Sequence, residues 1–350
     1  MNDDMILPWL RSPLRQALAS QRAHALLVQA AQGVGGFEFM LSLAQGWLCE
    51  ADDASVRPCG GCPSCHLVRQ RSHPDLYVLL PEVQRLELGW PLAGDGDDTS
   101  RSRAKPSRQI RIDEVRAAID WIGQTMSRAR AKVLLLQPAE AMNAQSASAL
   151  LKTLEEPPGA SRLLLGCRDV EHLLPTVRSR CQRLRLEPPA VEDAVAWLAA
   201  QGVAQPEVLL RAAAGAPLQA QSLFNAGIDA ARWSALPRAV AEGRASVFSG
   251  WPLPQVLDAL YKLCHDAMAM QASASPRYFS ADVLPPGASA RRVVDFVRTL
   301  NRVARHDEHP WNEGLLLEAL VTEAVASWAD DTKAAPAARP TAPPLATLDR

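Results

Sequence analysis

The 350-residue chain has no excess of either charge, because 37 Lys and Arg residues stand against 38 Asp and Glu residues. A broad basic field that recruits nucleic acid is therefore excluded, and any such contact must be local or shared with partners. The chain also lacks an apolar run of about 18 residues, the length that spans a bilayer. Its N-terminus, MNDDMILPW, is acidic and unlike a secretory signal. We therefore expect a cytoplasmic protein without a membrane partner.

Cysteine is present in a pattern that favours metal binding over disulfides. In a cytoplasmic chain the seven cysteines are expected to be thiols or metal ligands. Four of them have the spacing C-x9-C-x2-C-x2-C and are Cys49, Cys59, Cys62 and Cys65. Four thiolates complete a tetrahedral zinc shell, and C-x2-C spacing brings two sulfurs to one metal.

Two histidines close to this pattern are alternative ligands by their chemistry, His66 and His73, and four ordinary buried thiols are the alternative to a metal site. Four cysteines already suffice for zinc, which would leave no open coordination position for catalysis. We therefore predict a structural zinc site.

The stretch from Ser146 to Arg183 predicts a helix, a buried strand and a short amphipathic segment in succession. The helix carries leucines on one face and must end at Pro157-Pro158, because proline lacks the amide donor and restricts the residue before it. The run 162–167 is typical of a buried strand, as are 25–29 and 131–136. The last segment leads to Arg180. From these residues alone, Arg180 could be an ordinary solvated arginine at the surface.

The motif LLKTLEEPP at 150–158, followed by SRC at 179–181, resembles the clamp-loader branch of the AAA+ ATPases. The resemblance covers residues 1 to about 330, and the cysteine pattern also fits it. It implies an α/β fold with a P-loop-type parallel sheet core, a zinc-module insertion, a small helical lid and a C-terminal all-helical collar. It also implies that Arg180 is an arginine finger, which acts in trans on ATP held by a neighbouring subunit.

The phosphate-binding loop of this family is altered in the chain. A P-loop needs G-x-x-x-x-G-K-[ST], in which backbone amides and lysine hold the phosphates and the hydroxyl binds magnesium. The equivalent stretch has Ala30 for the first glycine, Gly36 for the lysine and Phe37 for the hydroxyl residue. Because Gly33 and Gly35 remain, we expect the turn to survive without its cation and metal ligand.

Three further nucleotide-handling positions are altered. Gln137 and Pro138 occupy the Walker B positions of the two acids, and neither side chain can replace a carboxylate on magnesium or a general base. Cys167 and Arg168 occupy the sensor positions, and Leu218 occupies the place of the sensor-2 arginine. The arginine finger is kept while these positions are altered, which predicts a subunit that supports ATP hydrolysis without performing it. We therefore expect ATP only on the neighbouring subunit and no nucleotide in the degenerate loop.

Proline-, glycine- and serine-rich boundaries divide the chain. The collar is expected to be an oligomerisation domain, although a bundle that packs only on its own chain stays open. The stretch 81–108 is polar and is predicted to be a solvated insertion. The predicted divisions are an AAA+ core at 1–187 with the zinc module at 49–65 and the insertion at 81–108, a lid at 188–240, a collar at 241–330 and a disordered tail at 331–350.

The resemblance implies a non-catalytic subunit of a pentameric loader that places the sliding clamp on primed DNA, within a DNA-directed DNA polymerase holoenzyme. Expected partners are gamma/tau-like motor subunits, a delta-like subunit and, through the complex, the clamp and DNA. One alternative is an ATP-hydrolysing gamma/tau-type motor subunit, which needs a lysine at position 36 and acids at 137 and 138. Another is a zinc-dependent nucleic-acid-binding protein that works alone, against which the near-neutral charge argues.

Overall fold

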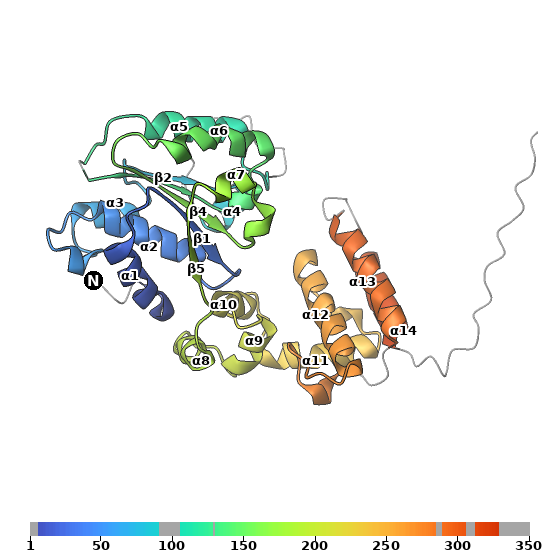
Figure 1. The fold of residues 1–350 in the computed structure, drawn as a ribbon. Helices are drawn as coiled ribbons and strands as arrows, with labels where there is room; N and C mark the ends of the chain where they lie inside the picture. Colours follow the sequence, from blue (N-terminus) through green and yellow to red (C-terminus); the bar gives the residue numbers. More distant parts are fainter. Residues whose placement is uncertain (1–5, 91–105, 129, 285–288, 306–311, 329–350) are drawn as a thin grey trace, which may run out of the picture. The chain divides into compact units, whose positions relative to one another are not determined.

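A computed structural model describes residues 6–90, 106–128, 130–284, 289–305 and 312–328 (Figure 1). The chain separates into two compact units, which are described individually. The first comprises 1–201 and 215–222, and the second comprises 202–214 and 223–350. The central stretch of the polar insertion, 91–105, and the predicted tail at 331–350 lie outside the described residues.

The first unit is built on a five-stranded sheet in the order β2-β3-β4-β1-β5, in which every neighbouring pair is parallel. This confirms the predicted parallel α/β core. The strands predicted at 25–29, 131–136 and 162–167 are all present. The strands are β1 (Ala25–Ala30), β2 (Leu76–Leu79), β3 (Lys132–Leu136), β4 (Ser161–Cys167) and β5 (Gln182–Leu186).

Helices cover both faces of this sheet, with α1 and α2 on one side and α5 and α6 on the other (Figure 1). Alternate strand residues point into the two layers: Leu26 and Val28 pack with the α1 and α2 side, whereas Leu27 packs with the α5 and α6 side. The helices are α1 (Arg11–Ser20), α2 (Gly36–Leu48), α3 (Pro63–Arg69), α4 (Glu82–Glu87), α5 (Ile112–Ile122), α6 (Ala144–Glu155), α7 (Pro175–Arg178), α8 (Val191–Ala200) and the start of α10 (Pro217–Asn225).

The second unit is helical. Its buried Asp266 accepts backbone N–H bonds from Arg277, Tyr278 and Phe279 at 2.7–2.8 Å, which fixes the loop after α12 onto that helix. No helix in the described residues of the chain has the length and apolar character needed to cross a bilayer. The helices of this unit are α9 (Pro206–Ala212), α11 (Ala230–Ala241), α12 (Leu253–Gln271), α13 (Ala290–Arg305) and α14 (Glu313–Trp328).

Candidate functional site

A glycine turn follows β1, where the sequence predicts the altered phosphate loop. Gly33 and Gly35 have φ of +79° and +102°, a left-handed conformation that L side chains rarely adopt. Gly35 is the N-cap of α2, so the turn delivers the chain from the end of β1 into this helix. Because β1 lies between β4 and β5, the turn sits at the switch point of the sheet, where α/β folds bind their ligands.

The position of the P-loop lysine is closed to larger side chains in this chain. A Cβ placed on Gly36 would lie 2.9 Å from the Cβ of Ala30, closer than real contacts allow. Ala30 itself occupies the position that is glycine in the P-loop pattern. The two substitutions therefore match each other sterically, since a methyl group has been gained at Ala30 and a whole side chain lost at Gly36.

A cavity of about 290 Å³ lies at this turn and has little positive charge. Among the described residues that line it, Arg168 is the one cation, against the carboxylates of Glu38 and Glu87. Glu38 lies in the first turn of α2, where the helix dipole favours an anion. The chain thus places its own carboxylate close to the helix N-terminus at which a P-loop would hold phosphate.

Burial raises the pKa of Glu38 above its ordinary value of 4.5, and a bond from its own backbone N–H opposes the shift. A raised pKa means that Glu38 contributes stability at low pH, and that this contribution is lost as pH rises through the folded-state pKa. We therefore expect Glu38→Gln to be more stable than the wild type at pH 7, by about 1.4 kcal/mol for each unit of the shift.

Urea unfolding at pH 4 and pH 7 tests this prediction, because the two proteins should converge at the lower pH. The exposed Glu87, which lines the same cavity, supplies the control variant Glu87→Gln. A wild type that gains stability over Glu38→Gln as pH rises would contradict the assignment.

The predicted Walker B positions lie at the end of β3 and present no carboxylate. A Cβ built on Gly166 of β4 would lie 2.0 Å from Oε1 of Gln137, so the amide of Gln137 rests directly on the neighbouring strand. Pro138 follows it and lines the cavity. The nearby carboxylate of Glu140 is already engaged, since it accepts backbone N–H bonds from Arg168 at 2.6 Å and Asp169 at 2.9 Å.

The start of α10 closes the turn from the other side. The N–H of Leu218 donates to the carbonyl of Gly33 at 3.0 Å, and Gln219 packs so closely that Gly33 has no room for a Cβ. Leu218, the predicted sensor-2 position, thus lines the cavity with an aliphatic side chain.

Arg180 lies directly after α7, apart from the residues that line the cavity. Its guanidinium pairs with Glu155, the last residue of α6 and a member of the LLKTLEEPP motif, and donates to the carbonyl of Thr176 at 3.0 Å. Its side chain is 32% exposed. The structure therefore joins the two motifs by an ion pair at the surface.

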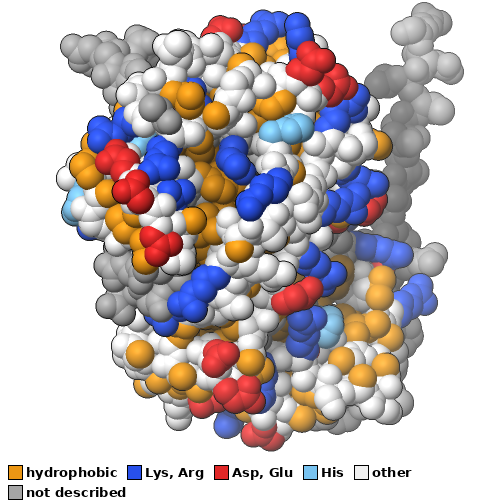
Figure 2. All heavy atoms as spheres, turned by 60° about the vertical axis from the view of Figure 1, so that its left-hand side comes forward, with side chains coloured by type: hydrophobic (Ala, Val, Ile, Leu, Met, Phe, Trp, Pro, Cys, Tyr) orange, Lys and Arg blue, Asp and Glu red, His pale blue; other side chains and the backbone are white. Residues whose placement is uncertain are grey.

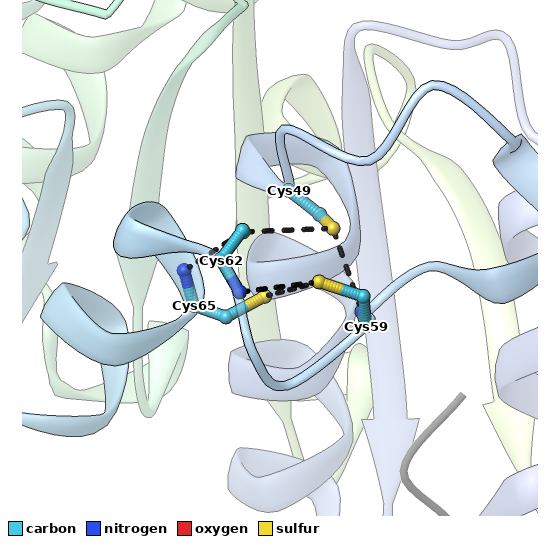
Figure 3. A group of neighbouring side chains, drawn as sticks. All are labelled: Cys49, Cys59, Cys62 and Cys65. Carbon is cyan, nitrogen blue, oxygen red and sulfur yellow. Dashed lines mark hydrogen bonds between the residues drawn. The ribbon is translucent and has the colours of Figure 1, made fainter.

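The four predicted cysteine ligands come together, with their sulfurs within 4.8 Å of one another (Figure 3). Cys49 ends α2, whereas Cys62 and Cys65 lie at the start of α3. The sulfur pairs Cys49–Cys62 and Cys59–Cys65 are 3.9 Å and 4.0 Å apart. Zinc–sulfur bonds of about 2.3 Å in a tetrahedron require sulfur separations of about 3.8 Å, so this group can hold a metal ion such as zinc.

Backbone N–H groups point at these sulfurs, which favours thiolates. The N–H groups of Cys59, Cys62 and Cys65 each donate to another cysteine's sulfur at 3.4 Å. Burial raises the pKa of Cys49 and Cys65. For Cys59 the effect of burial is outweighed by N–H bonds from Gly61 and Cys62, which lower its pKa to about 7. Metal binding therefore requires the cluster to release protons.

A partly buried polar network, which the sequence did not predict, ties the cysteine module to the segment that leads into β2. Glu50 accepts bonds from Ser64 and Arg128, each at 2.7 Å. His73, one of the alternative ligands, accepts the N–H of Asp75 at Nδ1, so its Nε2 carries the proton and bonds Ser64 at 3.1 Å. His73 is thus a packing partner of the module and lies outside the group of four sulfurs.

A parallel sheet that leads into a glycine turn and a helix at its switch point is typical of a P-loop-type α/β core, and here a four-cysteine insertion follows that helix. The sequence profile described as "DNA polymerase III, delta subunit" matches residues 9–190, and the chain belongs to this family.

Three proteins with similar sequences are DNA polymerase III subunits. The subunit delta' of Pseudomonas aeruginosa is 32% identical over 75% of this chain and 79% of its own length. The subunit delta' of Yersinia pestis is 30% identical over 92% of this chain and 94% of its own length. The subunit tau of Escherichia coli is 30% identical over 49% of this chain, which covers 22% of that longer protein.

Proposed function

We propose that this chain is a non-catalytic subunit of a DNA polymerase III clamp loader and assists ATP-driven loading of the sliding clamp onto primed DNA. The observation that carries the proposal is the state of the phosphate turn. Gly36 replaces the lysine, and Glu38 brings a carboxylate to the same helix N-terminus. The similarity to delta' subunits over most of the chain supports the same function.

Arg180 is the residue that would act on ATP, and it would do so on a neighbouring subunit. Its planar, permanently charged fork suits the oxygens of a γ-phosphate, where negative charge develops during transfer. In the single chain this fork is paired with Glu155 at the surface. Docking of a neighbour would therefore exchange a carboxylate for a phosphate and need no refolding of α7.

The remaining assignments belong to the same proposal. The cysteine cluster would hold a structural zinc ion, because four sulfur ligands leave no coordination position for a substrate. Partners would be gamma/tau-like motor subunits and a delta-like subunit of a cytoplasmic pentamer. Residues 1–187 would form the AAA+ core, 188–240 the lid and 241–330 the oligomerisation collar.

Calorimetric titration of the purified full-length chain with ATP and magnesium, with zinc retained, tests the supporting-subunit proposal. We expect no binding at millimolar ATP, because a triphosphate would meet Glu38 and no lysine at the turn. A gamma/tau-type motor subunit titrated in parallel is the positive control. Tight magnesium-dependent binding would overturn the proposal and favour the ATP-hydrolysing alternative.

A further inference from the structure

A second cavity of the first unit, of about 360 Å³, gathers four arginines: Arg22, Arg57, Arg130 and Arg162. Three of them lie at strand beginnings, because Arg22 precedes β1, Arg130 precedes β3 and Arg162 is near the start of β4. In a parallel sheet these beginnings share one edge, opposite the edge that carries the phosphate turn. The fourth, Arg57, comes from the cysteine module.

These positive charges have little compensation. Among the described residues, no carboxylate lies within ion-pair distance of Arg22, Arg57 or Arg162. Arg57 and Arg130 donate to backbone carbonyls, those of Ala51 at 2.8 Å and Glu50 at 3.0 Å respectively. The one ion pair is a long contact of 3.8 Å between Arg130 and a fully exposed Asp52.

Arg162 has a hydrogen-bond donor for which the described chain provides no acceptor. Its guanidinium lies 4.5 Å from the ring centre of Trp47, which fixes its plane, and its Nη1 is buried without a hydrogen-bond partner in the described chain. Burial and the charge of Arg22 both lower the pKa of Arg162. A buried donor without a partner destabilises the fold by about 1–3 kcal/mol, so a water or a ligand is needed to accept this hydrogen bond.

The chain as a whole carries no such excess, since 37 Lys and Arg residues stand against 38 Asp and Glu residues. On the face shown in Figure 2, Lys and Arg side chains are interspersed with Asp and Glu side chains. The cavity therefore fits one compact anion better than an extended polyanion.

We propose that this cavity binds a phosphate group through Arg22, Arg162 and Arg130. Guanidinium forks match tetrahedral oxyanions with paired, charge-assisted hydrogen bonds. The volume lies in the range of small-molecule sites, so the phosphate belongs either to a small phosphorylated compound or to a single phosphodiester of nucleic acid. This proposal does not depend on the clamp-loader role, and the site lies on the opposite edge of the sheet from the phosphate turn.

The test is titration of the full-length, zinc-retaining chain with inorganic pyrophosphate, at ionic strength held constant with chloride. We expect binding that Arg22→Glu and Arg162→Met each weaken about tenfold or more, since each removes a charge-assisted interaction. Arg238→Glu, on exposed α11 surface in the second unit, is the charge-matched control and should leave binding unchanged.

Two further measurements keep the proposal falsifiable. Arg22 is exposed, so Arg22→Glu should fold normally and unfold at the wild-type temperature or above, because it relieves repulsion. Competition with a short single-stranded oligonucleotide then identifies the source: displacement of pyrophosphate indicates a phosphodiester, and its absence a small phosphorylated ligand. Failure of the wild type to bind pyrophosphate, or binding that both variants retain, would overturn the proposal.

Discussion

Replacing Arg180 by alanine is expected to lower the ATPase rate of the assembled loader by roughly ten- to a hundredfold while this chain stays folded. The loss corresponds to one charge-assisted hydrogen bond made in the transition state, which is worth about 1.5–3 kcal/mol. Folding should be nearly unaffected, because the pair with Glu155 lies at the surface and such pairs contribute about 0–1 kcal/mol. The substitution is thus expected to slow ATP hydrolysis on the neighbouring subunit and to leave the stability of this chain nearly unchanged.

The measurement compares complexes assembled with wild-type chain, Arg180→Ala and Arg180→Lys at saturating ATP, clamp and primed DNA. Lysine keeps the charge and loses the fork, so its rate should lie between the other two. Arg185→Ala removes a similar surface arginine of β5, which is paired with Glu187, and should leave the rate unchanged. Wild-type ATPase and clamp loading by the Arg180→Ala complex would refute the finger assignment.

Loss of the metal from the cysteine cluster should have the largest effect on stability. Apparent zinc-binding energies of small modules are about 10–16 kcal/mol, and here they would stabilise a loop whose sulfurs already lie 3.9–4.0 Å apart. Even about 4 kcal/mol of that, lost in Cys62→Ser, would lower the unfolding temperature of a unit of this size by roughly 8–16 °C.

Metal analysis and thermal unfolding check this result together. The purified chain should contain equimolar zinc, and chelation should reproduce the lower unfolding temperature of Cys62→Ser. Cys264→Ser changes a buried cysteine of α12, in the other unit, and should leave the zinc content unchanged. A metal-free chain whose unfolding temperature is unaffected by Cys62→Ser would show that the cluster is only four packed thiols.

Local pattern was enough to predict the buried strands and the cysteine cluster. The run KVLLL is buried at every position, as its apolar composition predicts. The C-x2-C spacing predicts that the cysteine sulfurs lie together, and the structure brings them within 4.8 Å of one another. The strand β5 was not predicted, because QRLRL alternates polar and apolar residues and presents Arg183 and Arg185 to solvent. A short edge strand of this kind depends on its pairing with β1, which no local signal reports.

Two features of the sites could not be predicted, because they depend on contacts between distant residues. A single glutamate such as Glu38 in an apolar helix carries no signal until the turn folds around it. The four arginines of the second cavity are separated by tens of residues along the chain. Three of them meet because parallel strands begin at one edge, and the cysteine module adds Arg57. Residues that only the tertiary topology brings together cannot be identified from their spacing in the sequence.

The closeness of Ala30 to Gly36 would make a phosphate loop hard to acquire at this turn by single substitutions. The Cβ of a lysine placed at position 36 would meet the methyl group of Ala30 at 2.9 Å, so the single change would damage the turn before it could bind anything. Removing that methyl group first would confer no nucleotide binding. Selection for nucleotide binding would therefore favour neither substitution alone, and both would be needed before a nucleotide site could form at this turn.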